Sequence, residues 1–199
     1  MPAENTRQHI VDAADRLFYE QGFEATSFAH IAQAVGLSRG NFYYHFKSKD
    51  EILTAVIALR LAKTRQMLET WEKAEAPADR IRSFIHILIM NRAKIMSYGC
   101  PVGTLCSELA KLDHAAKDEA TKLFTLFREW LAGQFALLGC AEDADRLALH
   151  ILMRSQGVAT LATAFRDESF VEREVTDMTA WLDAQPPARL KEKTCSSSP

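Results

Sequence analysis

Residues 26–46 impose the strongest constraint on the fold of this chain of 199 residues. Two short segments with helical spacing flank Gly36, and a glycine tolerates the positive φ that a tight turn between helices requires. Ala32 supplies a small residue where a second helix would cross the first, while Ile31 and Phe42 have the spacing of apolar wedges. The pattern predicts two helices meeting at a sharp turn, which is either a helix-turn-helix motif or an ordinary helical hairpin.

The polar side chains of this region favour a motif that contacts DNA. Residues 35–49 hold three cations, Arg39, Lys47 and Lys49, and no acid. Hydroxyl, amide and aromatic groups lie among them, a mixture suited to phosphate oxygens and base edges. Two adjacent tyrosines on a short helix are poor core material, because both hydroxyls would need partners. The second helix of such a motif normally enters the major groove of double-stranded DNA.

The overall charge restricts how such a contact can be made. The chain carries 24 Lys and Arg against 26 Asp and Glu, which gives a formal net charge of −2. This balance argues against sequence-blind wrapping of a polyanion, which needs a basic surface. Residues 1–51 are also acidic in total, with 5 Lys and Arg against 7 Asp and Glu. We therefore expect DNA contact on one small face, with weak nonspecific binding.

Helical periodicity continues through the rest of the chain. There are eight glycines and six prolines, with no Asn-Gly or Asp-Gly hairpin signal, so we predict an all-α fold of about nine helices. Ser48 and Glu51 form the pattern of a capping box. In order, the predicted helices run from Asn5 or Thr6 to Gly22, from Thr26 as N-cap to Gly36, from Ser38 as N-cap, and over 48–71, 77–98, 104–112 with Thr104 as cap, 115–138, 142–166 and 170–184.

The lengths of these segments change near residue 50, where three short helices give way to longer ones. We therefore predict a helix-turn-helix domain over residues 1–50 and a larger helical domain over residues 51–185. Residues 186–199 are poor in apolar side chains and are expected to form a disordered tail.

One run of the sequence resembles a known family. From Gly36 to Glu51 it reads Gly-Leu-Ser-Arg-Gly-Asn-Phe-Tyr-Tyr-His-Phe-Lys-Ser-Lys-Asp-Glu, which resembles the DNA-binding signature of the TetR family of bacterial repressors. A first-helix pattern with Phe18, followed by Gly22-Phe23, precedes it in the matching order. The resemblance covers about residues 6–56, and the remainder matches only in length and helical character. It implies an N-terminal three-helix DNA-binding domain followed by a ligand-binding and dimerisation domain.

The resemblance also implies which side chains meet DNA. In this family the start of the second helix contacts phosphate, and the third helix presents its first residues to the groove floor. Arg39 is the candidate for reading guanine, and Tyr44 is expected to meet either the backbone or a thymine methyl. Lys47 is left open between a phosphate contact and plain solvation. The implied set is Thr26, Ser27, Ser38, Arg39, Gly40, Asn41, Tyr43, Tyr44, His45, Lys47 and Lys49.

Members of the family are homodimers, usually through their last two helices, here 142–166 and 170–184. A dimer is also needed for specificity, because one short helix reads only a few base pairs, so we expect a palindromic operator. The same apolar residues could instead form intramolecular core. The stripe assigned to the interface comprises Leu147, Ile151, Leu152, Gln156, Ala159 and Leu161 with Gly157 and Ala162, and then Phe170, Met178, Trp181 and Leu182.

A family repressor is released from DNA by a small molecule in its larger domain, so we expect a small apolar or electrophilic inducer. Aromatic, methionine and amide side chains at helical spacing are typical of such cavities, although plain core has the same composition. The candidate contacts are Phe84, Leu88, Asn91, Met96, Cys100, Phe124, Phe127, Trp130, Met153 and Gln156.

Two alternative hypotheses concern Cys100. It precedes a predicted helix N-terminus, where the helix dipole can lower a thiol pKa. The segment resembles those of family branches that sense electrophiles through a cysteine, so Cys100, together with Cys106, is a candidate sensor. The alternative is a buried small residue in a structural kink.

The sequence carries no signal for other compartments or for a metal. No run approaches the roughly 20 apolar residues of a membrane span, and the N-terminus lacks a signal-peptide pattern, so we expect a cytoplasmic protein without a membrane partner. Cys100, Cys106, Cys140 and Cys195 form no CxxC pair and no zinc-type spacing with histidine. We expect free thiols, no metal and no cofactor.

No pattern typical of catalysis is present either. There is no Walker loop or dinucleotide fingerprint. Glu108 and His114 are six residues apart, which does not place them on one helix face. We expect a protein that is not an enzyme, with a helical adaptor that does not bind DNA as the remaining alternative.

Overall fold

The computed structural model describes residues 3–74 and 76–185, and this part of the chain is helical. It contains ten α-helices, one 3-10 turn and no strand, which confirms the all-α prediction. The predicted tail at 186–199 lies outside the described residues. The elements are α1 (Ala3–Gln21), α2 (Phe28–Ala34), α3 (Arg39–His45), α4 (Lys49–Trp71), α5 (Pro77–Met90), α6 (Arg92–Tyr98), α7 (Pro101–Lys111), α8 (Lys117–Leu137), η1 (Ala141–Asp143), α9 (Ala144–Phe165) and α10 (Glu168–Asp183).

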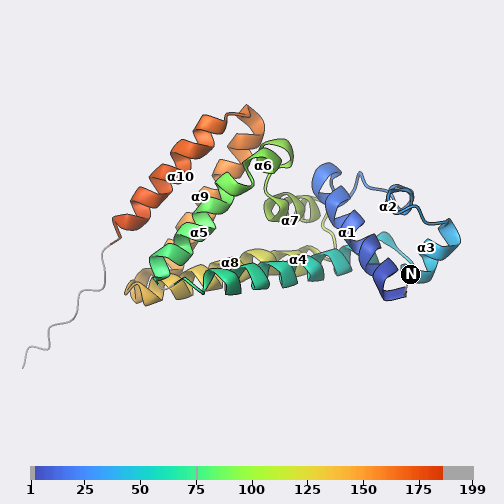
Figure 1. The fold of residues 1–199 in the computed structure, drawn as a ribbon, viewed down its shortest axis with the longest axis horizontal. Coiled ribbons are helices and arrows are strands. Elements are labelled where there is room, and N and C mark those ends of the chain that lie inside the picture. The colour runs from blue at the N-terminus through green and yellow to red at the C-terminus, as the bar shows by residue number, and fades with distance from the viewer. Residues whose placement is uncertain (1–2, 75, 186–199) are drawn as a thin grey trace, which may run out of the picture.

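The helices are arranged along one long axis (Figure 1). α1, α2 and α3 gather at one end, and α4 runs from them toward the other end with α8 against it. α9 packs against α8, and α10 packs against α5 at the end remote from α2 and α3. The short helices are therefore presented at one tip of the molecule.

The turn between α2 and α3 follows the prediction, but the cap of α2 does not. Gly36 has a φ of +66°, a conformation that glycine adopts without strain. The N-cap of α2 is Ser27, whose hydroxyl accepts from His30 N at 3.1 Å while His30 Nδ1 accepts from Ser27 N. The prediction that Thr26 is the cap is wrong. Thr26 is fully buried, and its hydroxyl donates to Gly22 O at 2.7 Å.

The caps of α3 and α4 were predicted correctly. Ser38 Oγ accepts from Asn41 N, and Ser48 Oγ accepts from Glu51 N at 3.1 Å. The carboxylate of Glu51 accepts from Lys47 N, one residue before the cap. The box is therefore closed one residue earlier than its standard form.

Two predicted helices have different bounds. The predicted helix over 77–98 is two helices, because the backbone leaves helical geometry at Asn91, where φ is −109° and ψ is 13°. This break raises the number from nine to ten in the described residues. The predicted helix over 104–112 begins three residues earlier at Pro101, a residue well suited to a first helical position. Its N-cap is Cys100, and Thr104 is inside the helix.

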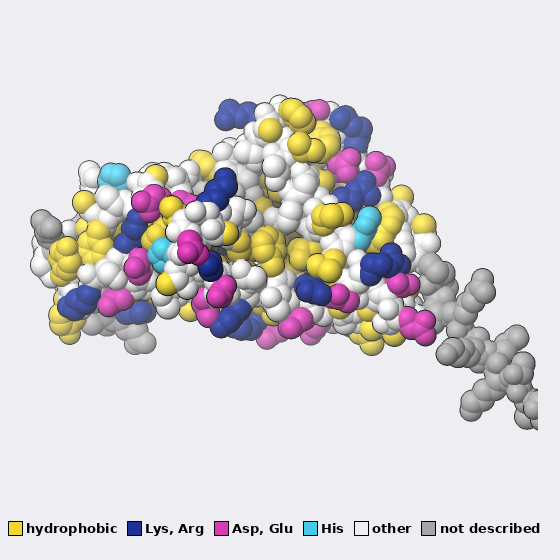
Figure 2. All heavy atoms as spheres, turned by 180° about the vertical axis from the view of Figure 1, so that it is seen from behind, with side chains coloured by type: hydrophobic (Ala, Val, Ile, Leu, Met, Phe, Trp, Pro, Cys, Tyr) yellow, Lys and Arg dark blue, Asp and Glu magenta, His cyan; other side chains and the backbone are white. Residues whose placement is uncertain are grey.

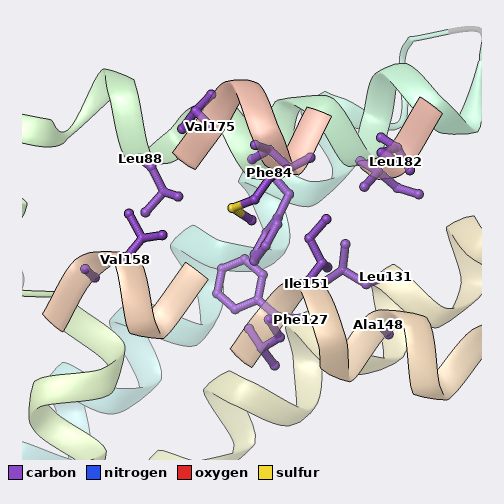
Figure 3. Close-up of a cluster of buried hydrophobic side chains, with 14 of the residues drawn as sticks. Phe84, Leu88, Phe127, Leu131, Ala148, Ile151, Val158, Val175 and Leu182 are labelled. Atoms are coloured by element: carbon purple, nitrogen blue, oxygen red, sulfur yellow. The ribbon is translucent and has the colours of Figure 1, made fainter. Parts of the chain in front are cut away.

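Two hydrophobic clusters hold the helices together. The larger one joins α5, α8, α9 and α10, with Phe84 and Phe127 in edge-to-face contact at a centroid distance of 5.4 Å. Figure 3 shows Leu88, Phe84 and Phe127 directed into the space between these helices. No helix in the described ranges is long and apolar enough to cross a membrane.

The second cluster unites the helix-turn-helix with the rest of the protein. It includes Phe23, Phe42 and Phe46 from the N-terminal region together with Leu105 of α7 and Leu123 of α8. The predicted boundary at residue 50 is therefore a change in helix length and not a break in packing.

We predict that Ser27 controls the stability of α2. Ser27→Ala removes the cap and should lower the free energy of unfolding by about 1 kcal/mol, whereas Ser27→Asp retains a capping oxygen and should lower it less. Urea unfolding followed by circular dichroism measures both. Equal losses for the two variants would contradict the capping role.

Candidate nucleic-acid interface and cavity

The side chains predicted to meet DNA are mostly exposed on α2 and α3. Phe42 and Phe46 are buried beneath them, and Gly40, Asn41, Tyr43 and Tyr44 of α3 face outward. Gly40 has open space where a Cβ would lie, so nothing in the chain prevents a partner from approaching its backbone. The exposed members of the predicted set are Ser27, Ser38, Gly40, Asn41, Tyr43, Tyr44 and Lys47, with His45 half-buried.

Aromatic contacts fix the orientation of this face. The Phe28 ring of α2 lies 4.6 Å from the Phe42 ring and 4.9 Å from the Tyr43 ring. Tyr44 is 72% exposed, and its ring meets the edge of His45 at 5.2 Å. α2 and α3 are thus locked through Phe28, while Tyr44 projects outward and is available to a partner.

Three cations of this region have different environments. Arg39 opens α3, and its side chain lies outside the described part of the structure. Lys47 Nζ donates to the carbonyl of Tyr43, where a cation interacts favourably with the negative end of α3. Lys49, which the resemblance includes among the DNA contacts, is half-buried, and its ammonium group donates to carbonyls of the α1–α2 loop.

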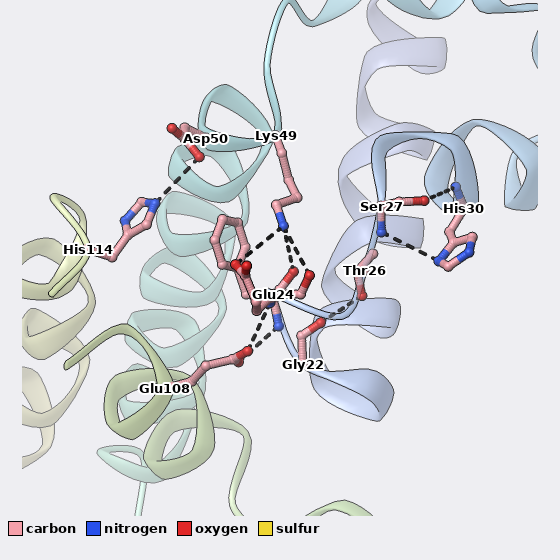
Figure 4. Close-up of polar contacts among 10 residues, drawn as sticks. Gly22, Glu24, Thr26, Ser27, His30, Lys49, Asp50, Glu108 and His114 are labelled. Atoms are coloured by element: carbon pink, nitrogen blue, oxygen red, sulfur yellow. Dashed lines mark hydrogen bonds and ion pairs between the residues drawn. The ribbon is translucent and has the colours of Figure 1, made fainter. Parts of the chain in front are cut away.

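Figure 4 shows this loop, which we define as residues 22–26, between two charged groups. Lys49 Nζ donates to Phe23 O at 3.0 Å and to Glu24 O at 3.4 Å, and it lies 4.2 Å from the centre of the Phe23 ring. Glu108 of α7 accepts from Phe23 N and Glu24 N, both at 2.9 Å. Thr26 is fully buried at the end of this loop, and its hydroxyl donates to Gly22 O, so its side chain does not face outward in this structure.

His114 adds a further contact beside the loop. Its Nε2 lies 3.4 Å from Asp50 Oδ1, and its ring meets the Phe23 ring edge-on at 5.1 Å. Its Nδ1 accepts from Ala116 N, which leaves the proton on Nε2, facing Asp50, in the neutral tautomer. This arrangement and the Glu108 contact are long-range pairs that no motif in the sequence signals.

Charge on the surface is mixed. The rear view in Figure 2 shows cationic and acidic side chains interspersed, with neither sign covering that face. This agrees with the net charge of −2.

A cavity of about 560 Å³ lies between the helix-turn-helix region and the larger bundle. Phe84, Phe124 and Phe127 supply aromatic walls, and Gln156 and Asn91 supply amides. Of the ten predicted contacts, seven line the cavity: Phe84, Leu88, Asn91, Cys100, Phe124, Phe127 and Gln156. The other three lie elsewhere: Met96 packs against the core, Trp130 Nε1 donates to Glu72, and Met153 is 67% exposed.

The sequence patterns did not predict the polar wall of this cavity. It is formed by Asp12, Asp15, Arg16, Tyr19 and Glu20 of α1 and by Arg60, Lys63 and Thr64 of α4. Arg60 is 8% exposed; its Nε donates to Asp15 Oδ1 and one terminal nitrogen donates to Pro101 O, both at 2.6 Å. The Tyr19 hydroxyl donates to Gly99 O at 2.8 Å, and burial raises its pKa to about 12. An acid at 15 and a base at 60 give no local pattern that signals their pairing.

The two candidate sensor thiols differ. Cys100 lines the cavity and accepts from Gly103 N at 3.5 Å. Cys106 donates to Ala120 O at 3.4 Å, and burial raises the pKa of its thiol to about 11. No cluster of three or more histidines, cysteines or acids able to hold a metal occurs among the described residues.

An exposed apolar stripe follows one ridge of α9. Its members recur every fourth residue, which places them in line along the helix. They are Leu149, Met153, Gly157, Leu161 and Phe165. Most of the residues predicted for a dimer interface are instead buried within the chain, namely Leu147, Ile151, Leu152, Ala159, Ala162, Met178 and Leu182. The predicted set and the exposed stripe share Gly157 and Leu161 and otherwise differ, because both faces of α9 are apolar.

Comparison with known proteins gives two family matches, one after the other along the chain. Residues 10–56 match the family described as "Bacterial regulatory proteins, tetR family". Residues 77–174 match the "Transcriptional regulator LmrA/YxaF-like, C-terminal domain".

Individual relatives agree with these matches. An uncharacterized HTH-type transcriptional regulator of Lactococcus lactis is 29% identical over 84% of this chain and 88% of its own length. The HTH-type transcriptional regulator AcrR of Shigella flexneri is 40% identical over 44% of this chain and 40% of its own length. A TetR transcriptional regulator of Legionella pneumophila superposes with a TM-score of 0.80 at 27% identity, covering 91% of this chain and 99% of that structure. These relatives are transcriptional regulators and not enzymes.

We predict that Cys106 is a slowly reacting thiol. Because its pKa is raised to about 11, its thiolate fraction at pH 8 should be about 100-fold below that of an ordinary thiol. Iodoacetamide should therefore modify Cys106 more slowly in the folded protein than in the urea-unfolded chain by at least this factor, measured by peptide mass spectrometry. Equal rates in the two states would exclude the protected environment.

Proposed function

We propose, on the premise that the chain belongs to the TetR family of bacterial regulatory proteins, that this transcriptional regulator is a repressor released from its operator by a small molecule. The observation that carries the proposal is the outward face of α3, where Asn41, Tyr43 and Tyr44 are exposed above buried Phe42 and Phe46. Such a face offers polar groups to a groove from a rigid base. The regulator acts in the cytoplasm, where its DNA lies.

In this proposal α3 reads bases and its flanks hold the phosphates. Ser38 and Asn41 supply short polar groups at the start of α3, and the bare backbone of Gly40 admits the edge of the groove. Arg39 reads a guanine through its paired N–H groups. Ser27, Tyr43, His45 and Lys47 hold the backbone, and Tyr44 meets backbone or a thymine methyl. Lys49 and Thr26 are left out, because both are engaged within the protein.

A second copy of the chain is the proposed occupant of the α9 stripe. Met153 and Phe165 are 67% and 68% exposed and lie in line with exposed Leu149 and Leu161, and a contiguous exposed apolar patch marks an interaction site. Gly157 at the centre of the stripe has open space at its Cβ position, so two helices can approach closely there. Pairing two α3 helices about a twofold axis matches a palindromic operator.

The cavity is the proposed inducer site. Its volume of about 560 Å³ suits a drug-sized molecule, and its walls combine aromatic rings with a few amides. A small apolar inducer would lie against Phe84, Phe124 and Phe127. Because α1 supplies part of the wall, an inducer would touch the DNA-binding region directly.

A second candidate function, release by an electrophile, is favoured by one observation. Cys100 belongs to the same cavity wall, so a reactive inducer held there would lie beside this cysteine. Cys106 is unsuited to this role, since its raised pKa keeps the thiol protonated. Induction that survives Cys100→Ser for every inducer would exclude this alternative.

We predict that Arg39 carries base recognition. Arg39→Ala should weaken binding to the DNA upstream of the regulator's own gene by about 10-fold or more, because a bidentate base contact is lost. Fluorescence anisotropy at fixed salt measures the affinity. Arg65→Ala, which removes an exposed cation of α4, is the control and should bind as the parent does. If the protein is instead a helical adaptor, neither the parent nor either variant will bind this DNA.

We predict that the α9 stripe forms the dimer. Met153→Glu combined with Leu161→Glu should convert the dimer to a monomer, because four carboxylates would face one another in the interface. Both side chains are exposed in the single chain, so its fold should be retained. Sedimentation velocity measures the mass, with Leu112→Glu, at an exposed leucine of another surface, as the control. A double variant that stays dimeric would exclude this interface.

A further inference from the structure

α7 touches both the cavity and the loop that leads into the helix-turn-helix. Its first turn, with Pro101 and Val102, lies in the cavity wall behind Cys100. Glu108 follows Pro101 by seven residues, which is about 10 Å along the same helix. One rigid element therefore connects the place where a ligand would lie to the backbone at residues 22–26.

Glu108 contacts the loop through both oxygens of its carboxylate. Glu108 Oε2 accepts from Phe23 N and Oε1 accepts from Glu24 N, each at 2.9 Å. A Cβ on Gly22 would lie 3.0 Å from Oε1, so the carboxylate sits directly against this glycine, whose φ is +92°. Hydrogen bonds to an ionised carboxylate are strong, and a planar pair of oxygens fixes direction as well as distance.

The loop has little freedom on its other side. Lys49 donates to the carbonyls of Phe23 and Glu24, the residues whose N–H groups meet Glu108 (Figure 4). Phe23 itself is 2% exposed. A movement of α7, which carries Glu108, would therefore move the loop. α2 begins at Phe28, only two residues after the loop ends.

The opposite end of α7 is also fastened. Arg60 donates to Pro101 O and to Asp15 Oδ1, so one buried guanidinium ties the first turn of α7 to α1 within the cavity wall. An occupant of the cavity that displaces Pro101 would move α7 along its length. Glu108 is where that movement reaches the helix-turn-helix.

We propose that Glu108 is the positioning residue that transmits the state of the cavity to the helix-turn-helix, by holding the backbone N–H groups of Phe23 and Glu24. Its consequence for DNA affinity rests on the proposed function. Displacement of α7 lengthens both hydrogen bonds together, because they share one carboxylate. The loop then loosens, and α2 and α3 lose their fixed relation to the rest of the protein.

The test uses the full chain with a defined occupant of the cavity wall. Cys106, Cys140 and Cys195 are replaced by alanine, which leaves Cys100 as the single thiol, and N-ethylmaleimide then places a bulky group at the start of α7. Hydrogen exchange at the Phe23 and Glu24 amides, followed by NMR, reports the loop. Val102→Phe adds bulk to the same wall by substitution, so it perturbs the wall even where alkylation of Cys100 is incomplete.

Each perturbation of the wall should accelerate exchange at these two amides by about 10-fold, the factor expected for losing one such bond. In Glu108→Gln the amide group can accept only one of the two N–H groups, so exchange should already be fast and the perturbation should add less than twofold. Glu69→Gln, at an exposed glutamate of α4, should behave as the parent does. Amides of the buried helices should be unchanged, which separates this effect from unfolding.

Parallel measurements of affinity for the DNA upstream of the gene separate the two hypotheses. The perturbation should weaken binding in the parent and change it little in Glu108→Gln, since coupling between the sites is lost. Equal acceleration in the parent and in Glu108→Gln would overturn the role of Glu108. If exchange behaves as expected while no variant binds the DNA, the proposed function fails and the positioning role stands.

Discussion

The burial of Phe23, Phe42 and Phe46 in one cluster is the interaction on which the rest of the structure depends. α2 and α3 have seven residues each, far below the length at which an isolated helix persists in water. Their geometry therefore comes from packing, and the cluster that packs them includes Leu105 and Leu123 from α7 and α8. The α3 face proposed to read DNA is consequently packed on the larger bundle.

This shared core determines how the two sites can communicate. A flexible linker between independent domains would isolate the helix-turn-helix from events in the cavity. Here α1 borders the cavity through Asp15 and Tyr19, and α4 runs from the helix-turn-helix along that cavity through Arg60. Packed elements move as units, so a displacement on the cavity side must be accommodated at the tip. The charged contacts at the α1–α2 loop give such movement a defined route.

The sequence sufficed for local features and failed for those that depend on long-range packing. Ser38, Ser48 and Gly36 act within a few residues, so their roles follow from spacing alone. The cavity residues were chosen by residue type on the helices that the resemblance assigns to the ligand site, and seven of the ten line the cavity. Thr26 was misread because Ser27 is an equally good cap, and only the burial of Thr26 distinguishes them. On α9 both faces are apolar, so periodicity could not say which one the core covers.

The residues that local pattern misses are also the ones that join the sites. Glu108 stands 84 residues from Glu24, and Arg60 stands 45 from Asp15, so neither contact leaves a signal in a short window of sequence. Lys49 was assigned to DNA through the family resemblance, yet its carbonyl partners lie 25 and 26 residues away within the chain. A cation in a basic stretch is therefore not necessarily a DNA contact, because it can stabilise the fold instead. In this protein Lys49 and Glu108 hold the two sides of one loop, and the exposed groups of α3 are the ones proposed to meet the DNA.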